Sequence, residues 1–319
     1  MATGITNISN MAPELPLQMA EDWLSTPIFN LIHSFGADLH YAQPHAGKTT
    51  RMSRMSPLST DGGQLDGSGI DPAPEVPVRT DVDATMEIFA KSIVINEQVS
   101  LWEHPNLQAK YSMLAGQWMR EKEDLLMRDL LASSPTYIMA TAGTNADQPT
   151  NITAQDVNNI ERILLSNDAR TLVMSVQATQ QFATASVRDA FFALCSTDLV
   201  GDLQAVSNVT LKADYAGNQD AFRPEEYCSV SRFRIFVSSK GAKVANASSL
   251  GATIYKVPMY GVESFGKVEQ NSYSAVLGYI PPWVMSTVAQ NAGIYAKFAI
   301  ARAIQNQSWL SGLLVTQRL

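Results

Sequence analysis

Three of the four histidines lie close together near the start of the chain. His33, His40 and His45 fall within thirteen residues, and Asp38 lies between them. Neutral imidazole nitrogens and carboxylate oxygens are zinc ligands, but structural zinc sites usually have tighter spacing and often include cysteine. Two interpretations stay open: a metal-dependent enzyme that uses this cluster, or histidines in a solvated loop. The spacing favours the loop.

The two cysteines, Cys195 and Cys228, lack the C-x-x-C spacing of a redox or zinc-binding pair. Cys195 lies inside an apolar run, where burial raises the pKa of a thiol and keeps it unreactive. The sequence contains no G-x-S-x-G, H-E-x-x-H or G-x-G-x-x-G motif. We therefore predict no catalytic residue, no cofactor site and no metal site, and we expect that the protein is not an enzyme.

Residues 49–95 form an unusual stretch for a folded chain. Its centre, "TDGGQLDGSGIDPAP", is rich in Gly and Pro, and alternating apolar residues such as Met86 and Ile88 follow it. Alternation is typical of strands. Loops longer than about 12–15 residues without structure of their own are uncommon and are usually functional, disordered or linkers. We predict a long two-stranded arm with the Gly-rich part at its tip.

The arm carries charges of both signs, among them Arg51, Arg54, Arg79, Asp61, Asp66, Asp71 and Asp81. Two interpretations stay open: a solvated loop, or complementary charges that dock the arm on another copy and set the register of that contact. An arm that cannot bury itself must offset its ordering entropy through contacts with something else. A neighbouring copy of the chain is the partner that this argument favours.

The clearest single element is a helix over 106–132. Pro105 suits the first turn, and Asp124 and Arg128, at i and i+4, are expected on the solvated side. Other apolar residues lie off the main stripe, so the helix needs partners on several sides. The predicted core stripe of this helix consists of Leu107, Tyr111, Leu114, Trp118, Leu126 and Leu130.

Shorter elements fill the rest of the chain. Thr153 and Asp156 make a capping-box-like start to a second helix. Apolar runs separated by Gly-rich turns predict strands at "AFFALCS", "FRIFVSS", "GATIYKVPMYG" and "SAVLGYI". The last stretch, 291–319, is ambiguous between helix and strand, and strands are favoured. Without a βαβ alternation or a repeat, the fold class is α+β.

Charged residues make up only 17% of the 319 residues, below the roughly 25% of an average globular chain. A low charge fraction fits a surface that is partly covered by other subunits. The formal net charge of −7 argues against a chain that grips nucleic acid through a basic surface. We expect no signal peptide and no membrane span, because the N-terminus lacks a charged start and no apolar run approaches about 18 residues.

Taken in order, the segments "TTRMSRMSPLSTDGGQLDGSGIDP", "VSLWEHPNLQAKYSMLAGQWMREKEDLLMRDLLAS", "FFALCSTDLVGDLQ" and "SVSRFRIFVSS" resemble the coliphage-N-four-type family of bacteriophage major capsid proteins. The resemblance covers residues 47–255. That family is similar to the Hong Kong 97-type capsid fold. The resemblance therefore implies a major capsid protein, which assembles in the host cytoplasm into the icosahedral shell of a virion and encloses a double-stranded DNA genome.

The same resemblance implies a division of the chain into parts. These are an N-terminal arm (1–48), an extended hairpin called the E-loop (49–95), a peripheral domain (96–149) with a spine helix (106–132), an axial domain (150–290) and C-terminal strands returning to the peripheral domain (291–319). The residues expected to contact other subunits through the E-loop are Arg51, Met52, Arg54, Met55, Leu58, Leu65, Asp66 and Ile70.

The implied partners are other copies of the chain in hexamers and pentamers, portal and scaffolding or decoration proteins, and packaged DNA in non-specific contact, with no membrane. A nanocompartment shell of the encapsulin type would share the fold and enclose cargo enzymes instead of a genome. It is the main alternative, ahead of the metal-dependent enzyme.

Overall fold

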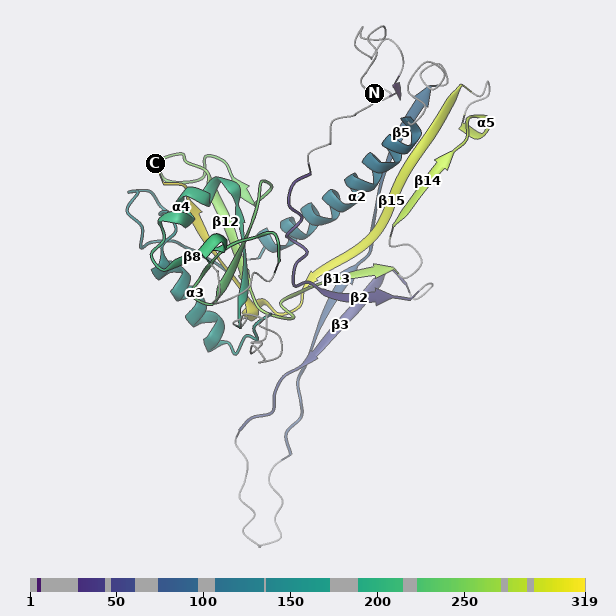
Figure 1. Cartoon of the computed structure of the whole chain (residues 1–319). Helices are drawn as coiled ribbons and strands as arrows, with labels where there is room; N and C mark the ends of the chain where they lie inside the picture. The colour runs from purple at the N-terminus through teal and green to yellow at the C-terminus, as the bar shows by residue number, and fades with distance from the viewer. Residues whose placement is uncertain are drawn as a thin grey trace, which may run out of the picture.

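The computed structural model contains two β-sheets, a long helix and a two-stranded ribbon that projects away from the rest (Figure 1). The structure describes residues 5–6, 28–43, 47–60, 74–96, 107–134, 136–172, 189–214, 223–270, 275–285 and 290–318. This is the sheet-rich α+β class that the residue pattern predicts. Within the described part of the chain, no helix is both long enough and apolar enough to cross a membrane.

The first sheet has six strands and is built around one long strand. Its spatial order is β1 (Ile5–Thr6), β5 (Glu87–Asn96), β15 (Asn291–Ile304), β13 (Phe265–Gln270) and β2 (Asp38–Ala42), with β14 (Val276–Ile280) also pairing β15. A short helix, α5 (Pro282–Met285), follows β14. Because β15 has fourteen residues, it pairs β14 along its first half and β13 along its second half.

Helix α2 (Leu107–Ala132) lies along one face of this sheet, beside β5 and β15 (Figure 1). It matches the helix predicted over 106–132. Of the predicted stripe, Leu126 is buried, whereas Tyr111, Leu114, Trp118 and Leu130 are half-buried, and the side chain of Leu107 is outside the description. The fully or nearly buried positions also include Ala115, Met127 and Leu131. Ala115 packs against the six-stranded sheet, whereas Met127 and Leu131 lie in a core that both sheets share.

One prediction for this helix is wrong. Asp124, expected on the solvated side, is 2% exposed and binds His33 through both carboxylate oxygens. Arg128 does not pair with Asp124; its guanidinium donates to Asp129 Oδ1, at 2.9 Å from Nε and 2.6 Å from Nη2. The reason is that residues 28–37 pass over this side of α2 and exclude water from Asp124.

The second sheet has eight strands. Its order is β6 (Tyr137–Met139), β16 (Leu310–Thr316), β12 (Ile254–Tyr260), β7 (Phe191–Ser196), β10 (Phe233–Ser238), β9 (Glu226–Val230) and β8 (Val209–Leu211), with β11 (Lys243–Val244) pairing β12. Strands β7 and β10 are parallel, as are β6 and β16. Three-residue 3-10 turns lie at Thr197–Leu199, Lys212–Asp214 and Gln307–Trp309.

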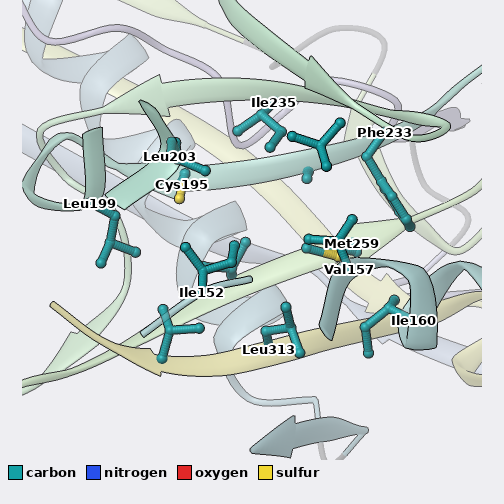
Figure 2. Packing of buried hydrophobic residues seen from close by; sticks show 14 of the residues in the cluster. Ile152, Val157, Ile160, Cys195, Leu199, Leu203, Phe233, Ile235, Met259 and Leu313 are labelled. Atoms are coloured by element: carbon teal, nitrogen blue, oxygen red, sulfur yellow. The ribbon is translucent and has the colours of Figure 1, made fainter. Parts of the chain in front are cut away.

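Helices α3 (Ala154–Ser166) and α4 (Val200–Ala205) cover this sheet and close the largest apolar core (Figure 2). Val157, Ile160 and Leu164 project from α3 and are fully buried. The predicted cap is present, because Thr153 Oγ1 accepts a hydrogen bond from the Asp156 backbone N–H. Cys195 and Cys228 are both free thiols buried in this core, and the burial of Cys195 was predicted from its apolar run.

The C-terminal stretch forms strands, as favoured by the sequence. However, the two strands belong to different sheets: β15 lies in the six-stranded sheet and β16 lies in the eight-stranded sheet. Strand β6 also joins the eight-stranded sheet, whereas β13 and β14 join the six-stranded sheet. Pairing partners that are far apart in the sequence decide this membership.

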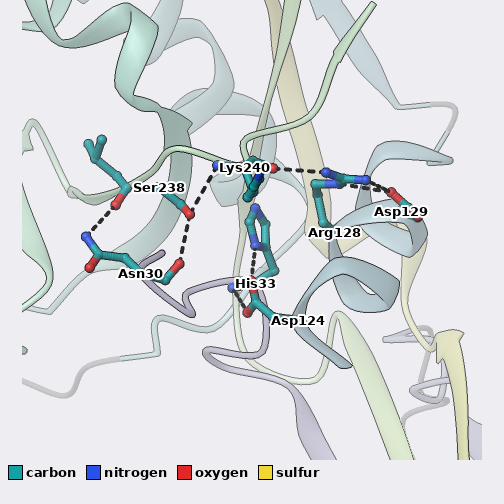
Figure 3. A network of polar contacts seen from close by, with 8 residues as sticks. Asn30, His33, Asp124, Arg128, Asp129, Ser238 and Lys240 are labelled. Carbon is teal, nitrogen blue, oxygen red and sulfur yellow. Dashed lines mark hydrogen bonds and ion pairs between the residues drawn. The ribbon is translucent and has the colours of Figure 1, made fainter. Parts of the chain in front are cut away.

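Residues 28–37, which we call the clasp, connect the two sheets and α2 (Figure 3). Asn30 Nδ2 donates to the Val237 carbonyl at 3.1 Å, and Ser238 Oγ donates to the Asn30 carbonyl at 2.8 Å. Ile32 is fully buried in the core that α2 shares with both sheets. The clasp therefore fixes β10 of one sheet to the helix that lies on the other.

Candidate functional site

The two-stranded ribbon extends beyond the two sheets and leaves most of its own side chains exposed. Its strands β3 (Thr49–Met55) and β4 (Arg79–Thr85) pair antiparallel, with Met52 opposite Val82. Strand β4 runs on into β5, so the ribbon continues a strand of the six-stranded sheet and then leaves the body (Figure 1). This agrees with the two-stranded arm predicted over 49–95, except that β5, from Glu87 onward, belongs to the sheet.

At its root the ribbon is anchored by apolar contacts. Met52 and Ala84 are buried in a small cluster with three alanines of β15, which are Ala299, Ala301 and Ala303. Met52 was predicted among the residues that contact other subunits, but its side chain is only 8% exposed and packs against its own sheet. Side chains alternate between the two faces of a strand, and Met52 is on the face that meets the alanines.

The opposite face of the ribbon carries a line of alternating charges. Arg79 Nε lies 2.6 Å from Asp81 Oδ1, and Arg51 Nε lies 2.7 Å from Asp83 Oδ1. A hydrogen bond from Ser53, together with the one from Arg79, lowers the pKa of Asp81, and the hydrogen bond from Arg51 lowers the pKa of Asp83. The Arg51–Asp83 pair joins β3 to β4, and Arg79, which pairs with Asp81 on its own strand, also donates to Ser53 Oγ across the ribbon at 2.7 Å. We call these four charged side chains the charge ladder.

Beyond β3 and β4 the two segments of the ribbon stay side by side and expose apolar side chains. The Ser56 N–H donates to the Val78 carbonyl at 2.8 Å, and the Ser59 N–H donates to both carboxylate oxygens of Glu75 at 2.9 Å. The exposed apolar residues are Met55, at the end of β3, and Leu58, Val76 and Val78 beyond the paired strands, each at least 60% accessible. Isolated apolar side chains are common on protein surfaces, but here four gather on a segment with no core of its own.

The eight predicted contact residues are therefore in four situations. Arg51 is in the charge ladder, and Arg54, Met55 and Leu58 are exposed on the ribbon. Met52 is buried at the root. The remaining three, which are Leu65, Asp66 and Ile70, lie outside the described residues. Sequence reasoning missed Val76 and Val78, although their alternation on either side of Pro77 was a signal for one apolar face.

A hollow of about 1110 Å³ lies at the root of the ribbon. It is bordered by the ribbon, by β2, by the end of α3 and by the turn before β16. Its lining mixes aromatic, charged and amide side chains, among them Tyr41, Arg54, Arg170, Gln305 and Trp309. The ribbon thus overhangs a polar recess where it leaves the body.

The histidines of the predicted cluster have separate roles where they are described. His33 is buried against Asp124, and His40 lies beside Asp38 and Gln305 at the recess. His45 is outside the described residues. Among the residues that the structure describes, no three His, Cys, Asp or Glu side chains are placed to hold one metal ion.

No family model matches the sequence, and no curated protein resembles it closely enough in sequence to count as a relative. Solved structures do resemble it. The capsid structure of cyanophage P-SCSP1u is 11% identical, with a TM-score of 0.64 over 93% of this chain and 92% of that chain. The capsid asymmetric unit of cyanophage Pam1 is 10% identical, with a TM-score of 0.63 over all of both chains.

A third similar structure is the holo-SrpI encapsulin complex from Synechococcus elongatus PCC 7942, which is 11% identical with a TM-score of 0.57 over 96% of each chain. At such low identities these likenesses show the fold alone. The chain has the sheet-rich α+β fold of phage capsid proteins, which is the Hong Kong 97-like fold expected from the sequence.

Proposed function

We propose that this chain is a major capsid protein that self-assembles into the icosahedral shell of a double-stranded DNA phage. In this proposal the ribbon is the E-loop, α2 is the spine helix, the six-stranded sheet forms the body of the peripheral domain and the eight-stranded sheet forms the axial domain. The shell consists of hexamers and pentamers, and the subunits assemble in the host cytoplasm.

The observation that carries the proposal is the ribbon. Its strands pair with each other, yet it exposes Met55, Leu58, Val76 and Val78, which no described part of the same subunit covers. Two-stranded ribbons are at best marginally stable in water when they stand alone. A second subunit that covers these side chains supplies the missing contact, and a shell of identical subunits supplies it at every position.

The similar fold of an encapsulin favours a second candidate, a nanocompartment shell. The two candidates make the same contacts between subunits and differ in what the shell encloses. Purified shells that contain DNA support the phage capsid, whereas shells that contain a cargo protein and no genome support the nanocompartment. We place the phage capsid first because the other two structural likenesses described above are to phage capsids.

The net charge of the chain bears on its contact with packaged DNA. An acidic chain with net charge −7 gains little from counterion release, so contact with packaged DNA is weak and non-specific. Tight binding of unassembled subunits to one defined duplex at physiological salt contradicts this part of the proposal. Portal, scaffolding and decoration proteins are proposed from the resemblance to phage capsid proteins.

The test shortens the ribbon without touching its root. Replacing residues 56–75 by a short Gly/Ser turn leaves Met52 and Ala84 in place, so the subunit stays soluble and folded. Shell formation, followed by negative-stain electron microscopy, is lost or severely reduced, because specific interfaces bury roughly 1,600 Å² and the ribbon supplies a large share of one.

A second variant keeps the length of the ribbon. It changes Met55, Leu58, Val76 and Val78 to serine, and its control changes Leu165, an exposed leucine on α3, to serine. We expect the ribbon variant to lose shells and the control to keep them. Normal particles from both ribbon variants would mean that the ribbon is a tolerated insertion and that the proposal is wrong.

A further inference from the structure

A second hollow, of about 810 Å³, lies along α2, and we call it the α2 hollow. It is lined by residues of α2, β14, β15 and the start of the clasp. Three large apolar side chains at it are about half exposed, which are Ile28 at 50%, Met113 at 52% and Leu277 at 47%. Apolar side chains that meet in one hollow from separate elements mark a contact site, unlike single apolar residues scattered over a surface.

A glycine of α2 also lines this hollow. Gly116 lies in the interior of the helix, where glycine is less favourable than alanine. A Cβ atom at this position would have no heavy atom within 4 Å among the described residues, apart from its neighbours in the helix. The described part of the subunit therefore gives no reason for a glycine here. A bare helix backbone is suited to close approach by another stretch of chain.

The chain that precedes the clasp starts and ends beside this hollow. Residues 7–27, which we call the N-terminal segment, lie outside the described residues. Ile28, which follows the segment, lines the α2 hollow. Thr6, which precedes it, pairs with Ile95 of β5, and Ile95 packs in one cluster with Ala115, the residue next to Gly116.

The length of the N-terminal segment suits a path along the hollow. When extended, a segment of this length reaches roughly 70 Å. Helix α2 has 26 residues and is therefore about 39 Å long. The segment can thus follow the hollow between its two fixed ends with length to spare.

The composition of the N-terminal segment matches the hollow. The segment has no Lys or Arg, and its charged residues are Glu14, Glu21 and Asp22. At the hollow, Arg120 is exposed and makes no ion pair with any described residue. The carboxylates there, Glu123 and Glu269, are both bound to Lys267. The large apolar residues of the segment are Met11, Leu15, Leu17, Met19, Trp23 and Leu24.

We propose that the N-terminal segment occupies the α2 hollow of its own subunit. Its apolar side chains cover Ile28, Met113 and Leu277, its backbone passes close to Gly116, and its carboxylates pair with Arg120. The hollow is then filled within the subunit, so it is not a docking site for another protein.

The test measures how quickly a thiol at position 113 reacts with a thiol reagent in the unassembled full-length subunit. The native Cys195 and Cys228 are buried, so the reaction reports the introduced thiol. Met113→Cys is compared with Leu165→Cys on α3, because the two side chains are similarly exposed in the described structure, at 52% and 42%. We expect Met113→Cys to react at least about ten-fold more slowly, because covering several apolar side chains favours the bound segment by more than one factor of ten.

A variant of the segment then removes the cover. Leu17→Ser, Trp23→Ser and Leu24→Ser are introduced together into the Met113→Cys chain. We expect the thiol to react as fast as that of Leu165→Cys, because the segment no longer has the apolar side chains that bind the hollow.

A variant of the hollow tests the ion pair. Arg120→Glu in the Met113→Cys chain is expected to speed the reaction, because like charges then face each other. Arg162→Glu on α3 makes the same change of net charge away from the hollow and is expected to leave the reaction slow.

The proposal is overturned if Met113→Cys reacts as fast as Leu165→Cys, or if its protection survives the three serine substitutions. Should those substitutions prevent folding, Arg120→Glu decides in their place. Protection that increases with protein concentration also overturns the proposal, because a second copy then supplies the cover. The measurements use unassembled subunits, so their outcome is independent of the proposed shell function.

Discussion

Replacing Asp124 by alanine removes the carboxylate that joins the clasp to α2. In the structure the His33 backbone N–H donates to Asp124 Oδ1 at 2.8 Å, and His33 Nδ1 lies 2.6 Å from Oδ2 (Figure 3). Both side chains are 2% exposed, so no water replaces the lost acceptor. Removing one partner of a buried, hydrogen-bonded pair destabilises a protein by about 3–5 kcal/mol. We expect Asp124→Ala to lower the free energy of unfolding by that amount.

The assay is urea denaturation of the unassembled subunit, followed by tryptophan fluorescence. The control is Asp129→Ala on the same helix, because Asp129 is 58% exposed and its pair with Arg128 is of the surface kind, worth about 0–1 kcal/mol. Asp124→Asn keeps an acceptor for the His33 N–H and is expected between the two. If the free energies of unfolding of Asp124→Ala and Asp129→Ala differ by less than 1 kcal/mol, the contact between His33 and Asp124 does not stabilise the fold, and the reasoning is refuted.

Two further predictions concern the interior. Trp118 is half-buried, and its ring lies edge-on to Phe298 at 6.1 Å between centroids. We expect Trp118→Ala to lower the free energy of unfolding by about 3 kcal/mol and Trp118→Phe to lower it by less. Equal effects of the two variants in urea denaturation would show that ring size does not matter there. Burial raises the pKa of Cys228 to about 12 and that of Cys195 higher still, so both thiols stay protonated at pH 8. A thiol reagent should therefore modify neither in the folded subunit and both in urea, and rapid labelling of the folded form would contradict the packing.

Elements whose evidence is local were predictable from the sequence. The apolar spacing from Tyr111 to Leu130 indicated α2 almost to the residue, and the Thr153–Asp156 pair indicated the start of α3. The ribbon was predictable because its Gly- and Pro-rich centre is flanked by alternating residues. In each case, the physical cause lies within a few residues of the position concerned.

What the sequence did not show depends on partners far along the chain. Asp124 looks like a solvated residue on a helical wheel, and only its contact with His33, 91 positions away, buries it. Strands β12 and β13 are neighbours in sequence but belong to different sheets, because β12 pairs β16 whereas β13 pairs β15 and β2. Likewise, the contact between Gln305 and His40 joins residues 265 positions apart, and no local pattern announces it.

The clasp also bears on how the subunit folds during synthesis. Asn30 is made early, but Val237, which accepts its side-chain hydrogen bond, follows 207 residues later. At about 5–20 residues per second, the ribosome takes roughly 10–40 s to cover that distance. Tyr260, whose hydroxyl donates to the Phe35 carbonyl at 2.6 Å, comes later still. Throughout this interval the clasp lacks these two partners, so its hydrogen bonds to β10 and β12 of the eight-stranded sheet form only late in synthesis.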